Sequence, residues 1–138
     1  MQSLESALRN LRIIHIALLA SIPLYAFAGE FLEPVPRDVS RIHRVLLVLL
    51  VAELGAVTVI RSRIVAPAQE ALRLPTPDPG EVQRWFTGSF ISYVICEAVT
   101  LLGLVLRFLG GTFAQAAPFY AAGFVLLLFL APRNPAHQ

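Results

Sequence analysis

The chain has 138 residues, of which 57% are hydrophobic and only 14% are charged, and its mean hydropathy is +0.70. Soluble domains carry about 25% charged residues, so this composition excludes a disordered chain and indicates a membrane protein. The length predicts a single domain, 1–138, and excludes an enzyme with separate cofactor and substrate domains. All eleven basic residues are arginine, which excludes chemistry that needs a lysine, such as Schiff-base formation.

The formal net charge of +2 does not indicate a nucleic-acid partner, because the arginines are scattered between apolar blocks and form no basic patch. The single cysteine, Cys96, lies in an apolar run and cannot form an internal disulfide. No metal-ligand spacing, phosphate-binding loop or credible catalytic triad is present. We therefore predict no metal, no cofactor and no enzymatic activity.

Four apolar stretches follow one another along the chain, at residues 13–32, 45–60, 85–109 and 113–131. Each is close to the roughly 20 residues that a helix needs to cross a bilayer. Backbone polar groups in lipid must be satisfied within the segment, so each stretch predicts a transmembrane helix. The expected fold is all-α, with four transmembrane helices in a compact antiparallel bundle. A cleaved signal peptide is the alternative interpretation of the first stretch.

The arginines near the ends of these stretches predict the orientation, because cytoplasmic loops carry more of them. One side has seven, namely Arg9, Arg12, Arg61, Arg63, Arg73, Arg84 and Arg133, against Arg37, Arg41, Arg44 and Arg107 on the other. The outer loop also carries Glu30, Glu33 and Asp38. This count predicts both termini and the loop 61–84 in the cytoplasm, and we expect a multi-pass protein of a bacterial inner membrane.

The loop 61–84 carries its own signals. Pro67 predicts the start of a short helix through Leu74, which the prolines of 75–77 end. Asp78 followed by Pro79 is typical of an N-cap, so the third long helix is expected to begin there, outside the membrane. At its other end, Gly110 and Gly111 predict a tight turn into the fourth helix.

Two carboxyl groups lie near the middle of apolar stretches, Glu53 in the second and Glu97 in the third. A charged carboxylate at that depth costs about 3 kcal/mol, so such a residue pairs, faces the bundle interior or binds a proton. Because the two helices run in opposite directions, both carboxyls are expected at a similar depth. Glu53 has no hydroxyl one turn away and needs a partner on another helix, such as Glu97 through a shared proton.

The third helix has one polar and small-residue face, within an arc of about 140°. It comprises Ser89, Ser92, Tyr93, Cys96, Glu97, Thr100, Gly103 and Arg107. One interpretation is a packing seam, formed by Ser89, Ser92, Cys96 and Gly103. The other is an ion-binding carboxyl, Glu97, with Tyr93 and Thr100 as hydrogen-bond partners. Arg107 either extends to the interface or pairs with Glu30.

The segment 95–106, Ile-Cys-Glu-Ala-Val-Thr-Leu-Leu-Gly-Leu-Val-Leu, resembles the second helix of the rotor-ring c subunit of rotary ATP synthases. The resemblance extends over residues 42–109 and implies a helical hairpin in which Glu97 carries a proton or a sodium ion. It also implies that Glu53 corresponds to the acid or amide on the first helix of some sodium-binding relatives. The second span has only Gly55 in place of the family's glycine repeat, so a divergent c-like protein is expected.

Two functional hypotheses follow from the sequence. The first is a c-subunit-like protein that binds or helps to move protons or sodium ions, at Glu97, Glu53, Tyr93 and Thr100, as a homo-oligomer in the lipid bilayer. The second is a non-catalytic structural or accessory subunit, which packs its seam against a larger membrane complex. Neither hypothesis involves nucleic acid or a cofactor.

Overall fold

The computed structural model of the chain describes residues 3–31, 34–74 and 78–134, and these contain helices but no β-strand. In chain order the elements are α1 (Leu4–Phe31), α2 (Ser40–Ile60), the π-helix η1 (Arg61–Val65), α3 (Ala66–Ala71), α4 (Pro79–Phe108) and α5 (Phe113–Phe129). The predicted all-α class is confirmed. Glu33 and the prolines of 75–77 lie outside the described residues.

Three helical segments are long and apolar enough to cross a membrane: α1, the continuous segment Ser40–Ala71, and α4. The fourth apolar helix, α5, has 17 residues, and a rise of 1.5 Å per residue gives it a length of about 26 Å. The structure therefore has three helices of membrane-spanning length and composition, which indicates a membrane protein. The fourth predicted span is a shorter apolar helix.

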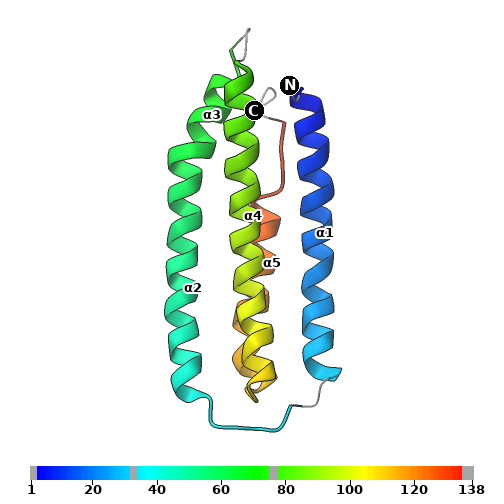
Figure 1. Cartoon of the computed structure of the whole chain (residues 1–138), viewed down its shortest axis with the longest axis vertical. Coiled ribbons are helices and arrows are strands. Elements are labelled where there is room, and N and C mark those ends of the chain that lie inside the picture. The colour runs from blue at the N-terminus through cyan, green and yellow to red at the C-terminus, as the bar shows by residue number, and fades with distance from the viewer. Residues whose placement is uncertain (1–2, 32–33, 75–77, 135–138) are drawn as a thin grey trace.

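Helix α4 is the central element. It packs against α5, α1, α2, η1 and α3, and Figure 1 shows it between α1 and α2, with α5 behind it. The start of α1, the helix α3 and the chain that follows α5 lie at one end of the molecule (Figure 1). We call this the terminal end and the opposite end, where α1 leads to α2 and α4 leads to α5, the loop end.

Both predicted ends of the third long helix are confirmed. Asp78 is the N-cap of α4, and its side chain accepts a hydrogen bond of 2.9 Å from the backbone N–H of Gly80, with Pro79 at the first helical position. At the other end, Gly110 has a φ of +96°, a conformation that favours glycine. A side chain at Gly110 would also place its Cβ 2.5 Å from the carbonyl oxygen of Val35.

The segment 61–84, predicted as a loop with a short internal helix, is helical from Arg61 to Ala71 without a break after α2. Pro67 lacks a backbone N–H and removes one helical hydrogen bond. The chain adjusts just before it, where the N–H of Ala66 reaches back to the carbonyl of Arg61 in a π-turn. The π-turn therefore lets one helical segment continue past a proline that, in the sequence, is typical of a new helix start.

The outer faces of α1 and α2 are apolar and exposed. On α1 the side chain of Ile16 is 65% exposed, and on α2 those of Val48 and Val51 are 70% and 67% exposed. Exposed apolar area on this scale is typical of contact with lipid or with another membrane helix. By contrast, α4 buries residues along its whole length, which places the core of the molecule around it.

Candidate functional site

Glu97 lies in the middle of α4, is half-buried, and faces α1. The hydroxyl oxygen of Ser21 in α1 lies 2.8 Å from Glu97 Oε1. The same hydroxyl oxygen lies 2.6 Å from the backbone carbonyl oxygen of Leu18, one turn earlier on α1. Ser21 therefore connects the carboxyl group of one helix to the backbone of another.

The number of protons available to Glu97, Ser21 and the carbonyl of Leu18 limits how many hydrogen bonds these groups can form. A serine hydroxyl has one proton to donate and can also accept, whereas a backbone carbonyl only accepts. Both short contacts are full hydrogen bonds at the same time when Glu97 donates to Ser21 and Ser21 donates to the carbonyl of Leu18. With an ionised carboxylate, two acceptors would compete for the one hydroxyl proton.

Two further features surround this carboxyl. Tyr25 lies one helical turn after Ser21, on the same face of α1, and its phenol interacts with both Glu97 and Ser21. The second oxygen, Glu97 Oε2, is shielded from solvent and has no hydrogen-bond partner among the described residues. A buried carboxyl oxygen without a partner is costly, and more so when it carries charge.

Glu53 lies on the inward face of α2, in the same stripe as the buried residues Leu46 and Val57. It is half-buried, and its Oε2 is also shielded and without a hydrogen-bond partner in the described part of the chain. Glu53 on α2 and Glu97 on α4 both act electrostatically on the thiol of Cys96. Within the same residues the structure records no hydrogen bond between the two carboxyl groups.

The structure directs the hydroxyls of Tyr93 and Thr100, the predicted partners of Glu97, to other acceptors. Tyr93 is buried and donates 3.0 Å to the carbonyl of Leu130, at the end of α5 where carbonyls lack a helical partner. Thr100 is buried and donates 3.2 Å to the carbonyl of Cys96, one turn earlier on its own helix. The hydroxyl that lies within hydrogen-bonding distance of Glu97 is that of Ser21 in α1.

The four residues predicted as a packing seam are all buried: Ser89, Ser92, Cys96 and Gly103. Helix α5 covers much of this face at close range. A Cβ at Gly103 would lie 3.0 Å from the Cβ of Phe119, and a Cβ at Gly123 would lie 3.0 Å from the carbonyl of Cys96. Small residues on both helices thus allow the close approach of α4 and α5.

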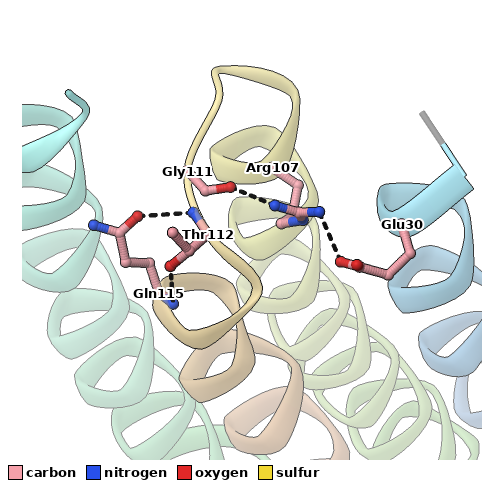
Figure 2. A network of polar contacts seen from close by, with 5 residues as sticks. All are labelled: Glu30, Arg107, Gly111, Thr112 and Gln115. Atoms are coloured by element: carbon pink, nitrogen blue, oxygen red, sulfur yellow. Dashed lines mark hydrogen bonds and ion pairs between the residues drawn. The ribbon is translucent and has the colours of Figure 1, made fainter. Parts of the chain in front are cut away.

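At the loop end, polar contacts join α4 to α1 and to the turn before α5, as Figure 2 shows. The guanidinium of Arg107 forms a 2.8 Å ion pair with Glu30 of α1 and donates to the carbonyl of Gly111. This is one of the two interpretations of Arg107 given by the sequence, and the structure confirms the pair. Beside it, Thr112 and Gln115 form a reciprocal capping box at the start of α5 (Figure 2).

Sequence reasoning missed the contribution of α1 to the site. Ser21 and Tyr25 are the polar signal, since two hydroxyl residues four apart in an apolar helix share one face. A third polar residue of α1, His15, is buried. Its Nε2 lies 2.7 Å from the carbonyl oxygen of Leu127 in α5. Its ring also contacts that of Tyr93. These contacts fix α1 against the α4–α5 pair.

Comparison of the chain with protein-family models, with curated proteins and with solved structures found no match.

Proposed function

We propose that this chain is an integral membrane protein in which Glu97 binds a proton in the bilayer interior, with Glu53 as a second proton-binding carboxyl. The observation that supports this most strongly is the position of the Ser21 hydroxyl, within hydrogen-bonding distance of both Glu97 and the carbonyl of Leu18. Only a protonated Glu97 supplies a donor for each of these two hydrogen bonds.

The distribution of charge supports the same proposal. The ion pairs in the described ranges lie near the two ends of α4, and neither of them includes Glu97 or Glu53. An uncompensated carboxylate at mid-membrane costs about 3 kcal/mol on insertion scales. Binding a proton removes the charge, so the shielded oxygen of each residue belongs to a neutral group and costs less to bury.

The donor set favours a proton over a metal cation. The side chains that interact with the Glu97 carboxyl are the hydroxyl of Ser21 and the phenol of Tyr25. Hard cations such as Ca²⁺ and Mg²⁺ take about six or more oxygen ligands. A sodium ion would need more oxygen atoms than these neighbours supply, whereas a proton needs one acceptor.

We place the protein in a bacterial inner membrane with four crossings, α5 being the fourth, and with the terminal end in the cytoplasm. The arginine count of seven against four supports this orientation. The resemblance of residues 95–106 to the ion-carrying helix of rotor-ring c subunits adds support for Glu97 as the proton-binding group. Movement of the proton then requires a neighbouring chain, because α1 and α5 cover α4 within one copy.

A second candidate function is that of a structural or accessory subunit, and one surface feature favours it. Ala52, Gly55 and Ala56 are exposed on α2, and a Cβ at Gly55 would meet no atom within 4 Å. Small residues on an exposed membrane helix favour close packing against another helix. If association is the main function, Gly55→Ile will dissociate the assembly, and native mass spectrometry will detect smaller particles.

The proton-binding proposal is tested by labelling with a hydrophobic carbodiimide, which reacts with protonated carboxyls in apolar surroundings. In native membranes at neutral pH we expect Glu97 to be labelled, and alkaline pH to protect it. Glu97→Gln should abolish this labelling. Glu30→Gln is the matched control, because Glu30 pairs with Arg107 at the loop end, and it should leave the labelling unchanged.

Two results would count against the proposal. Labelling that is absent at neutral pH in membranes containing folded protein would show that Glu97 is not a protonated apolar carboxyl. Labelling that persists in Glu97→Gln on a residue other than Glu53 would place the reactive group elsewhere. Protection by sodium at constant pH would replace the proton with sodium as the bound ion.

A further inference from the structure

A polar cavity of about 120 Å³ lies at the terminal end, apart from the two membrane carboxyls. Its lining comes from η1, from α3, from the first half of α4, and from the end of α5 and the chain that follows it. The residues that matter to its chemistry are Arg61, Trp85, Ser89, Tyr93 and Arg133. Among the described residues, two arginines and no acidic residue line this cavity, so it is electropositive.

Arg61 is the central charge of this cavity. It is half-buried, and it lines the cavity together with the buried side chain of Tyr93. Neither of the ion pairs in the described part of the chain involves it. A partly buried guanidinium without a counter-ion is unfavourable, and an anion in the cavity would relieve this cost.

The π-helix holds Arg61 in this position. Gly88 of α4 lies directly against η1, since a Cβ at Gly88 would be 2.8 Å from Cγ2 of Val65. This contact fixes the turn in which Arg61 is the first residue. Ser89, the next residue of α4, is buried and lines the cavity. Its hydroxyl is a hydrogen-bond donor of the kind that phosphate oxygens accept.

An apolar groove adjoins the cavity and shares Arg61, Val65 and Leu130 with it. The groove has a volume of about 430 Å³ and runs beside α2 and α5, where Val57 and Leu126 line it. A positively charged cavity continuous with an apolar groove, at the edge of membrane-spanning helices, matches a lipid with an anionic headgroup. A free anion in the cavity alone would leave the groove without an occupant.

We infer that the cavity binds the phosphate group of an anionic phospholipid through Arg61 and Arg133, with an acyl chain in the adjoining groove. Arginine suits this role, because its planar guanidinium can donate two hydrogen bonds to one phosphate. Arg133 is exposed at the cavity and adds a second charge. The inference rests on the proposed membrane placement and not on proton binding by Glu97.

The test is native mass spectrometry of the full chain, released from nanodiscs that contain phosphatidylglycerol and phosphatidylcholine. We expect one retained phosphatidylglycerol per chain, and Arg61→Gln should weaken its retention about tenfold. Arg63→Gln is the matched control, because Arg63 is exposed two residues away and lines neither the cavity nor the groove. It should retain the lipid as the unaltered chain does.

A second variant keeps the inference testable if Arg61→Gln does not fold. Arg133 is exposed, so Arg133→Gln should leave the fold intact and weaken retention about threefold. Equal retention in Arg133→Gln, Arg61→Gln and Arg63→Gln would overturn the inference, as would equal retention of the two lipids. Inorganic phosphate that displaces the lipid at millimolar concentration would show a site for free anions and overturn the lipid assignment. Carbodiimide labelling of Glu97 on the same samples reports the proton site separately.

Discussion

The two faces of α4 differ in how completely their polar groups are satisfied. Toward α5, Tyr93 and Thr100 each donate to a carbonyl, and small residues bring the backbones close together. Toward α1, Glu97 has one oxygen at the Ser21 hydroxyl and another that is shielded and without a partner in the described residues. On the same helix, the hydroxyls of Tyr93 and Thr100 are therefore paired with carbonyls, whereas the carboxyl of Glu97 is paired at one of its two oxygens only.

This difference separates packing from chemistry. The hydroxyl of Tyr93 donates to the carbonyl of Leu130 and so stabilises the contact between α4 and the end of α5. The hydroxyl of Thr100 donates within α4, and neither hydroxyl has a proton to spare for a neighbouring carboxyl. A carboxyl with an open oxygen has a place for a proton to bind and to leave. We therefore assign the α5 face to stability and the α1 face to proton binding. The predictions below test this assignment, from the largest effect to the smallest.

The largest effect is expected from Gly123→Val, on the α5 side of the seam. A Cβ at Gly123 would lie 2.0 Å from Thr100 Oγ1, so α4 and α5 would have to separate. We expect the free energy of unfolding to fall by about 3 kcal/mol, measured by circular dichroism during titration with a denaturing detergent. Gly55→Val is the control, because a Cβ there meets no atom within 4 Å. Equal losses in the two variants would contradict close packing at the seam.

The next effect concerns the loop end. Arg107→Met removes the guanidinium that joins Glu30 to the carbonyl of Gly111, and its side chain is only 12% exposed. We expect the free energy of unfolding to fall by about 2 kcal/mol, because the buried carbonyl loses its donor. Glu30→Gln should cost less than about 1 kcal/mol, since Glu30 is 51% exposed. A larger loss in Glu30→Gln than in Arg107→Met would reverse this ranking and contradict the account.

A smaller effect is expected from Ser21→Ala, which removes the link between Glu97 and α1. We expect a loss of about 1 kcal/mol in the free energy of unfolding and a decrease in carbodiimide labelling of Glu97 at neutral pH. Ser62→Ala is the matched control, because Ser62 donates to the carbonyl of Val59 and contacts no carboxyl group. Labelling that is unaffected by Ser21→Ala would show that the serine does not support the neutral form of Glu97.

The smallest effect is a pH dependence outside the membrane. The hydroxyl and the backbone N–H of Ser40 both donate to Asp38 and lower the pKa of its carboxyl below the ordinary 3.8. A lowered pKa in the folded state means that the contribution of Asp38 is complete above about pH 4. It is lost as pH falls through the lowered value.

We therefore expect the amide signal of Ser40, followed by NMR in micelles, to shift only below pH 4. Asp38→Asn should remove that shift while the signals of α4 stay unchanged. A Ser40 signal that shifts near pH 6 would contradict the pairing with Asp38.

The sequence predicted the helical class and the ends of α4 because these depend on local chemistry. Asp78 and Pro79 are local signals that start α4. Gly110 provides the positive φ of the turn that follows α4. The continuation of α2 past Pro67 was not predictable, because the π-turn before it depends on packing of Val65 against α4. Local signals define where a helix can begin, but tertiary contacts decide whether it does.

The site was predictable only in part for the same reason. Glu53 and Glu97 are conspicuous in apolar runs, so the two carboxyls could be selected from sequence alone. Their partners could not, since the rotation of α1 that brings Ser21 to Glu97 depends on contacts between distant segments. The spacing along α4 predicts Thr100 as a partner of Glu97, but its hydroxyl donates to a carbonyl of its own helix.

The central claim is that Glu97 is neutral within the membrane, and infrared spectroscopy of the protein in lipid bilayers at neutral pH tests it most directly. The account predicts a carbonyl band of protonated carboxylic acids that weakens in Glu97→Gln, where Glu53 alone contributes to it, and is unchanged in Glu30→Gln. Loss of a carboxylate band in Glu97→Gln, with no change in the protonated region, would show that Glu97 is ionised and would contradict the account.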